Sequence, residues 1–193
     1  MEKIIPKRFK ESSEVKTRFL KENLPQFLDV IKLISHTFEA GNKLFFFGNG
    51  GSAADAQHLA AEFVNRYVMD RPPLPAIALT TDTSILTSVS NDIAFNEIFA
   101  KQLRALGKEG DVAIGITTSG NSPNIIKAFE VAKEMGIKTV ALTGNDGGTA
   151  VNMADFSLIV PSSSTPRIQE THILIGHILC EMVENYLFFK VNP

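Results

Sequence analysis

The stretch that decides the fold is residues 44–63, which read LFFFGNGGSAADAQHLAAEF. It opens with four apolar residues, as a buried parallel strand does, and then turns through glycines, an asparagine and a serine. The alanine-rich remainder has high helix propensity, and Ser52 is a suitable N-cap for that helix. The order strand, glycine turn, helix leaves backbone N–H groups and a helix N-terminus facing whatever lies beyond the strand.

The predicted helix carries His58 and Glu62, which are four residues apart and therefore share one face. Together with the polar turn, they indicate an anion or sugar site. Two simpler interpretations stay open: the glycines form only a tight turn, or the histidine and glutamate are only a solvated pair. The positions of Gly48, Gly50 and Gly51 do not fit the dinucleotide fingerprint, and no Walker lysine follows them.

Composition is typical of a soluble globular protein with one domain. Of the 193 residues, 44% are hydrophobic and 21% charged, and the net charge of −2 does not favour nucleic acid or a membrane surface as the main partner. Cys180 is the single cysteine, which excludes an intrachain disulfide framework and indicates a reducing compartment. The first residues lack the apolar core of a signal peptide and no run is long enough to span a bilayer, so we expect a cytoplasmic protein.

Residues 8–40 are charged but carry apolar side chains at helical spacing. Pro25 stands where one helix can give way to another, and Gly41 is a natural stop, so two N-terminal helices are predicted over about residues 1–41. Their phenylalanines need a buried environment, which either a partner chain or the same domain can supply. The apolar positions are Val15, Phe19, Leu20, Leu24, Phe27, Leu28, Ile31, Ile34 and Phe38.

From residue 44 onwards, short apolar runs alternate with helical patterns. The predicted strands are 44–47, 76–79, 112–116, 139–142 and 157–160, and the predicted helices lie near 53–67, 83–90, 95–106, 123–135, 148–153 and 167–189. This alternation predicts a doubly wound α/β fold, in which helices flank a five-stranded parallel sheet, within one domain spanning residues 1–193. Ligands of such sheets bind beyond the carboxyl ends of the strands.

Polar segments follow these strands at several places. The first is residues 49–52, and the helix after the second strand ends in Asn91 and Asp92. The third strand is followed by TTSGNSPN at 117–124, where Ser122 is an N-cap before a first-turn proline. Hydroxyls, backbone N–H groups and a helix dipole can hold a phosphate without a cation, so this segment predicts a phosphate cradle, with an ordinary loop as the alternative.

A fourth polar segment, residues 162–170, opens the last helix. Gln169 and His177 are eight residues apart and lean towards one side of that helix. His172 is placed about as well, so spacing does not choose between the two histidines. Because apolar residues surround His177 in the sequence, a packed core position is also open for it.

Four motifs occur together and in order: NGGSAxDAxHxxxE at 49–62, Asn91-Asp92, TSGNSxN at 118–124, and TPxxQExH at 165–172 followed by His177. On these motifs, the chain resembles the phosphoheptose isomerases, which have the sugar-isomerase (SIS) fold, over nearly its whole length. The resemblance implies a flavodoxin-like SIS domain that converts sedoheptulose 7-phosphate to D-glycero-D-manno-heptose 7-phosphate. That reaction is the first step towards the activated heptoses of lipopolysaccharide or capsule.

The resemblance also implies a homotetramer with active sites shared between subunits, and roles for individual residues. Glu62 and His177 would be the catalytic pair, and His58, Glu62, Gln169 and His177 bind zinc in some members. The sugar would be held by Asn49, Gly50, Gly51, Asn91 and Asp92, the phosphate by Thr117, Thr118, Ser119 and Ser122, and further substrate contacts would come from Ser52, Glu62 and Gln169. The chain departs from the family in the segment Ile93-Ala94-Phe95-Asn96, where relatives often have a glycine.

Aldose–ketose conversion moves a proton between two sugar carbons through an enediol. One carboxylate for the carbon-bound proton and one group for the carbonyl oxygen suffice, and Glu62 and His177 suit these roles. Zinc conflicts with them, because a ligating carboxylate is a weaker base and a metallated imidazole nitrogen cannot carry a proton. Two interpretations stay open: zinc acts as a Lewis acid on the substrate oxygens, or it occupies a site that catalysis does not need.

Two other classes of protein share this fold and length. One is a non-catalytic SIS regulator, such as a factor that associates with the replication initiator, and the other is a different sugar-phosphate isomerase. The complete set of Glu62, Gln169 and His177 favours the enzyme over the regulator, because a pure binding protein does not need these side chains. Pocket size, which would separate one sugar phosphate from another, cannot be inferred from the sequence.

Overall fold

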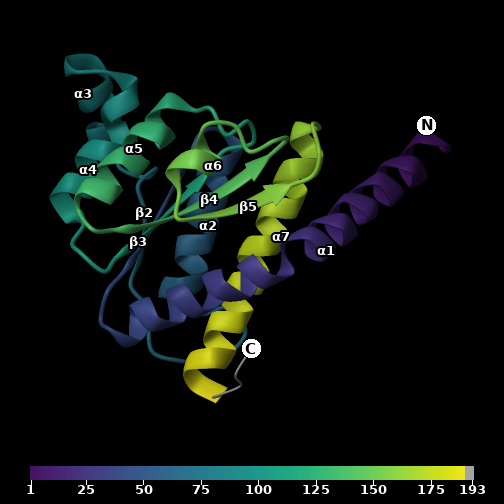
Figure 1. The fold of residues 1–193 in the computed structure, drawn as a ribbon, viewed down its shortest axis with the longest axis horizontal. Coiled ribbons are helices and arrows are strands. Elements are labelled where there is room, and N and C mark those ends of the chain that lie inside the picture. The colour runs from purple at the N-terminus through teal and green to yellow at the C-terminus, as the bar shows by residue number, and fades with distance from the viewer. Residues whose placement is uncertain (190–193) are drawn as a thin grey trace.

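The computed structural model describes residues 1–189 and has helices on both faces of a five-stranded parallel sheet (Figure 1). In chain order its elements are α1 (Ile4–Glu39), β1 (Leu44–Gly48), α2 (Gly51–Val64), β2 (Ala76–Ala78), α3 (Thr83–Asp92), η1 (Phe95–Glu97), α4 (Ile98–Leu106), β3 (Val112–Ile116), α5 (Pro123–Glu134), β4 (Lys138–Gly144), α6 (Ala150–Met153), β5 (Phe156–Val160), α7 (Thr165–Glu184) and η2 (Asn185–Phe189). The strand order is β2-β1-β3-β4-β5. This is the flavodoxin order, and it confirms the predicted doubly wound α/β fold.

The strands are apolar along their length because both faces of the sheet are covered. β1 lies between β2 and β3, pairs in parallel with both, and is buried throughout. Side chains on alternate positions enter different cores. Phe46 joins the core beneath α1, α2 and α7, whereas Phe45 and Phe47 join the core beneath α4, α5 and α6.

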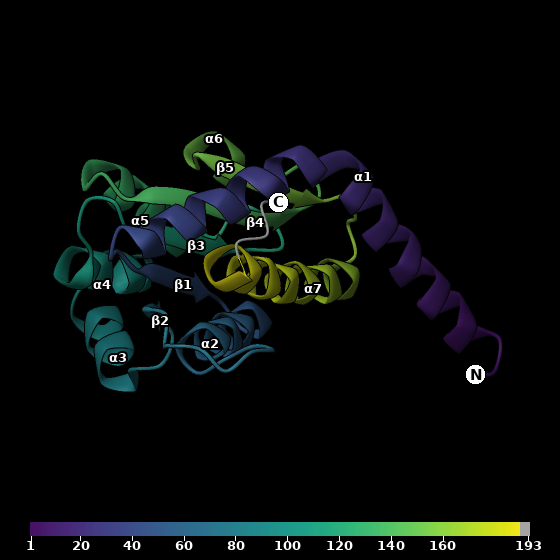
Figure 2. The same cartoon turned by 90° about the horizontal axis from the view of Figure 1, so that it is seen from below.

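The N-terminal segment is one helix rather than the two that we predicted. α1 runs through Pro25 without ending, although a proline inside a helix removes a hydrogen bond and costs about 3 kcal/mol. Packing offsets this cost, since residues on both sides of the proline enter the same core of this chain. These buried residues are Val15, Phe19, Phe27, Val30, Ile31, Ile34 and Phe38. The first half of α1 nevertheless projects beyond the sheet and its covering helices (Figure 2).

Helix boundaries agree with the predictions to within a few residues, with one informative exception. α2 begins at Gly51 with Gly50 as its N-cap, so Ser52 lies buried in the first turn and is not the cap. Gly50 has a φ of 56°, a value that favours glycine, and this turn lets the helix start two residues earlier than the hydroxyl predicted. In the segment 93–96, which departs from the family pattern, Ala94 has extended backbone with a φ of −171°, which any residue adopts.

Within residues 1–189, none of the helices combines the length and the hydrophobicity that crossing a bilayer demands.

Candidate functional site

The carboxyl ends of β1 and β3 meet at the point where the strand order reverses, which is where ligands of such sheets bind. The loops after these strands are joined by Asn49 and Asn124, whose side-chain amides exchange two hydrogen bonds of 2.9 and 2.8 Å. Asn124 is buried in the first turn of α5. The pair therefore fixes the glycine turn that begins α2 against the segment that begins α5.

The predicted phosphate cradle forms a compact turn in front of α5. Ser122 is the N-cap as predicted, and its hydroxyl lies 3.0 Å from the Thr117 hydroxyl. The Ser119 hydroxyl accepts a hydrogen bond from the Asn121 backbone N–H at 3.2 Å. Gly120 has a φ of 68° and passes so close to the Gly147 carbonyl that no β-carbon fits between them. Hydroxyls and backbone donors thus face the N-terminus of α5, a favourable place for an anion.

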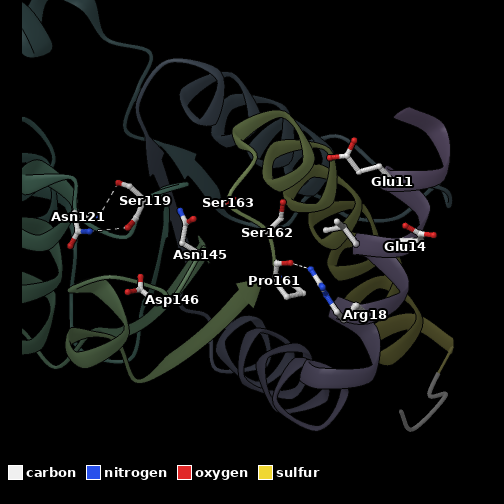
Figure 3. A pocket seen from close by; sticks show the side chains of 11 residues that line it. Glu11, Glu14, Arg18, Ser119, Asn121, Asn145, Asp146, Pro161, Ser162 and Ser163 are labelled. Atoms are coloured by element: carbon white, nitrogen blue, oxygen red, sulfur yellow. Dashed lines mark hydrogen bonds between the residues drawn. The ribbon is translucent and has the colours of Figure 1, made fainter. Parts of the chain in front are cut away.

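A hollow of about 1060 Å³ opens beside this turn, under the projecting half of α1. Figure 3 shows Ser119 and Asn121 on one side of it and Glu11, Glu14 and Arg18 of α1 on the other. Arg18 donates a hydrogen bond across the gap to the Pro161 carbonyl. The remaining lining residues are Val15, Asn145, Asp146, Pro161, Ser162 and Ser163.

α2 and α7 lie side by side on one face of the sheet, and they bring His58 and His177 together. The two Nε2 atoms are 2.8 Å apart, so one imidazole donates a hydrogen bond that the other accepts. Glu62 lies on the same face of α2, with its Oε1 atom 3.6 Å from His58 Nε2. The ring of Tyr67 packs against His177, with ring centroids 5.6 Å apart. His177 is therefore a site-facing residue rather than a buried core histidine.

Gln169 also reaches α2. A β-carbon at Gly51 would lie 2.6 Å from Gln169 Nε2, so the Gln169 side chain rests over the first residue of the helix. His172, which spacing did not separate from His177, points elsewhere: it is buried, and its Nε2 lies 3.0 Å from the Thr143 carbonyl. Burial lowers the pKa of His172 to about 4, although the bond to Thr143 opposes the shift. Neutral His172 donates this hydrogen bond. The structure thus places His177 in the cluster with His58, and His172 outside it.

Asp55 belongs to the same cluster, although it is not among the predicted site residues. Its Oδ2 atom is buried and has no hydrogen-bond partner among residues 1–189. Burial raises the pKa of Asp55 above its ordinary value, while His58 and His177 act in the opposite direction. The sequence contains a signal for it, because Asp55 is three residues before His58 and therefore on the same face of α2.

A buried ion pair that no sequence motif predicted joins α7 to the last turn of α2. Arg71 Nε lies 2.8 Å from Glu184 Oε1 of α7, and both side chains are at most 2% exposed. Arg71 also donates to the backbone carbonyls of Glu62 and Phe63, the last turn of α2. Glu184 accepts three backbone N–H groups of residues 67–69. These bonds, with Arg71, lower the pKa of Glu184 despite its burial.

Asn91 and Asp92 do not join this cluster within the chain. They are the last, exposed residues of α3, and their side chains bond to each other at 2.8 Å. α3 lies beside the β2 edge of the sheet, away from α7 (Figures 1 and 2). The sugar contacts predicted for these two residues are therefore not assembled by one chain.

The donor set of the cluster suits zinc chemically, since imidazole, carboxylate and carboxamide groups all occur here. Among residues 1–189, however, no three His, Cys, Asp or Glu side chains lie close enough together to hold a metal ion. The two imidazole nitrogens at 2.8 Å are closer than the roughly 3.3 Å that two ligands of tetrahedral zinc require. A metal therefore requires His58 and His177 to separate slightly and Glu62 to approach them.

Comparison with known proteins shows the family to which the chain belongs. The SIS domain family model matches residues 9–144. The phosphoheptose isomerase of Thermodesulfovibrio yellowstonii is 53% identical over 184 residues, which cover 95% of this chain and 92% of the relative. The chain belongs to the phosphoheptose isomerase family.

Solved structures of the phosphoheptose isomerase family have the same fold. The structure from Neisseria gonorrhoeae matches with a TM-score of 0.90 and 42% identity, over 95% of this chain and 98% of that one. The structure from Francisella tularensis matches with a TM-score of 0.91 and 41% identity, over 95% and 97%. The predicted family and SIS fold are thus confirmed.

Proposed function

We propose that this protein is an aldose–ketose isomerase that converts sedoheptulose 7-phosphate to D-glycero-D-manno-heptose 7-phosphate. The observation that carries the proposal is the pairing of His58 with His177, with Glu62 beside His58 and Gln169 over the first residue of α2, in a chain of the phosphoheptose isomerase family. The product supplies the activated heptoses of lipopolysaccharide or capsule.

The reaction needs a base, a group that serves the carbonyl oxygen and an anchor for the phosphate. The Glu62 carboxylate takes the proton from C1 of the ketose, while His177 gives a proton to the C2 oxygen, which yields the enediol. The protonated Glu62 then returns its proton to C2, while the C1 hydroxyl gives its proton back to His177, which yields the aldose and restores both side chains. The turn at residues 117–122 holds the phosphate through its hydroxyls and the N-terminus of α5. Net atoms and charge are conserved, as an isomerisation requires.

We propose that His58, Glu62, Gln169 and His177 also hold a zinc ion. When bound, zinc supplies Lewis-acid polarisation of the substrate oxygens. His177 cannot offer the same nitrogen to zinc and to a proton at once, so the metal and the proton transfer by His177 are alternative uses of that nitrogen.

We also propose a cytoplasmic homotetramer. Two observations support assembly: Asn91 and Asp92 lie away from the cluster within one chain, and the projecting half of α1 exposes Ile4, Ile5 and Phe9. A neighbouring subunit can bury these side chains and bring polar residues to the hollow under α1. A reducing compartment suits the buried, unpaired Cys180.

A non-catalytic sugar-phosphate regulator is the other candidate, because the phosphate-binding turn alone would serve it. Incubating the purified protein with sedoheptulose 7-phosphate, and following the sugar by NMR, separates the two. The proposal expects an aldose signal to grow with enzyme concentration. Saturable binding without any aldose would establish the regulator instead.

A further inference from the structure

α7 carries a glycine where the helix has no conformational need for one. Gly176 is buried in the interior of α7, one residue before His177. A glycine inside a helix is less favourable than an alanine, because it loses more conformational freedom on folding. Its φ is ordinary, since Gly176 is not among the glycines with positive φ. The reason for the glycine must therefore lie in the space around it.

That space is filled by Leu59 of α2. A β-carbon at Gly176 would lie 2.4 Å from Leu59 Cδ2, 2.6 Å from Cδ1 and 3.0 Å from Cγ. Three atoms of one side chain are involved, so the rotation of a single methyl group does not relieve the overlap. Leu59 is itself only 1% exposed and packs in the core between α2, α7 and the sheet, where density leaves little room for another rotamer. The missing β-carbon is what lets α2 and α7 approach here.

The contact sits directly beside the candidate site on both helices. Leu59 follows His58 in the sequence, and Gly176 precedes His177. The Nε2 atoms of His58 and His177 are 2.8 Å apart. Moving Leu59 and residue 176 apart would therefore change the distance between the His58 and His177 rings. The buried Arg71–Glu184 pair ties the same helices together beyond this point. Because that anchor resists a uniform separation, an alanine at 176 must tilt or locally displace one helix at the histidines.

We propose that Gly176 is a positioning residue: by admitting Leu59, it sets the distance between His58 and His177 and hence the geometry of the isomerase site. The inference rests on the proposed function for its kinetic consequence but not for its structural one. Gly176 is buried against Leu59 and is not part of the phosphate-binding turn at residues 117–122, so its replacement should leave that turn unaffected.

The test is a double-mutant cycle of Gly176→Ala and Leu59→Ala. In Gly176→Ala, kcat should fall by about tenfold or more while KM for sedoheptulose 7-phosphate stays within about twofold, because misplacement of catalytic groups by about 1 Å costs up to 100-fold. Adding Leu59→Ala removes the overlapping atoms, so the double variant should recover kcat to within about threefold of Leu59→Ala alone, a clear departure from additivity.

Two further measurements keep the outcome independent of folding and of the proposed function. The midpoint of urea unfolding shows whether Gly176→Ala remains folded, and crystal structures of the wild type and the variant give the His58–His177 separation directly. A separation that is longer in Gly176→Ala and restored in the double variant supports the inference even if the wild type converts no sedoheptulose 7-phosphate, a result that overturns the proposed function alone. An unchanged separation, or a loss of kcat that Leu59→Ala does not relieve, overturns the inference.

Discussion

His172 and His177 lie five residues apart on α7, yet the fold gives them opposite environments. His177 faces His58 across the gap between helices, whereas His172 is buried against Thr143 with its Nδ1 atom unpartnered among residues 1–189. Sequence spacing could not separate them, because each lies about equally near Gln169 around the helix, on opposite sides of it. The choice depends on which neighbour each ring meets, and that is set by α2 and β4, far away in the chain.

Stability should depend on pH through His172. Its pKa is about 4 in the folded protein and about 6.5 in the unfolded chain, so between these values the unfolded chain binds a proton that the folded one does not. The contribution of neutral His172 to stability is therefore fully present above pH 6.5 and is lost as the pH falls towards 4. The loss in the free energy of unfolding amounts to about 3 kcal/mol near pH 4. Urea unfolding at pH 7 and at pH 4.5 measures this loss.

The matched control is His172→Gln, which keeps a donor for the Thr143 carbonyl but does not titrate. Carboxylates such as Glu184 and Asp155, whose pKa values are lowered, destabilise both proteins alike in acid. The wild type should therefore lose more stability than the variant between the two pH values. Equal losses would show that His172 does not titrate as its burial requires.

Metal removal separates the two proposed uses of His177. If zinc, rather than proton transfer by His177, serves the substrate oxygens, dialysis against a chelator should lower turnover of sedoheptulose 7-phosphate by about tenfold or more, and added zinc should restore it. His58→Ala should retain less zinc after gel filtration, measured by mass spectrometry of the metal. His36→Ala is the control, since His36 bonds to Tyr186 away from the cluster. Full activity in metal-free protein would contradict a catalytic metal.

At the scale of the elements, the sequence predicted most of the fold for a simple physical reason. Strands that are covered on both faces must be apolar throughout, so all five were visible as short apolar runs between glycines and helical patterns. Two predictions were wrong, and both concern where a helix begins or is interrupted. Ser52 looked like a cap, but Gly50 makes the turn earlier; Pro25 looked like a break, but tertiary packing on both sides of it carries the helix through.

The turn between β3 and α5, residues 117–122, is the predicted phosphate-binding site. Ser119→Ala and Ser122→Ala should each weaken binding of sedoheptulose 7-phosphate by roughly ten- to a hundred-fold, since a lost hydrogen bond to a charged group costs about 1.5–3 kcal/mol. Isothermal titration with each variant gives the dissociation constant. Ser88→Ala, on the exposed face of α3, is the matched control. Wild-type affinity in both cradle variants would remove this turn from the site.

At the scale of the whole molecule, one chain accounts for only part of the predicted site. The glycine turn and the phosphate turn meet at the carboxyl ends of β1 and β3, and Gln169 of α7 rests over the first residue of α2. Asn91 and Asp92 remain apart on α3. The spacing of the motifs could not show this, because it depends on where the strand order places β2 and the helix that follows it.

The assembly itself is open to a direct measurement. The proposed tetramer should give about four times the mass of one chain in multi-angle light scattering at micromolar concentration. Phe9→Glu, on the projecting half of α1, should shift the population towards smaller species, because it places a charge where a partner's apolar surface is expected. Lys32→Glu, an exposed charge reversal on the same helix, is the control. A stable wild-type monomer would refute the shared site.

In the proposed reaction, the Glu62 carboxylate moves a proton between two carbons of the substrate. Glu62→Gln keeps the size and hydrogen bonding of the side chain but removes the base, so turnover of sedoheptulose 7-phosphate should fall by about 100- to 10,000-fold. Glu22→Gln, an exposed change on α1, should turn over like the wild type. Folded Glu62→Gln should still bind the substrate in isothermal titration but convert almost none of it; turnover within a few-fold of the wild type would contradict the role of Glu62 as the base.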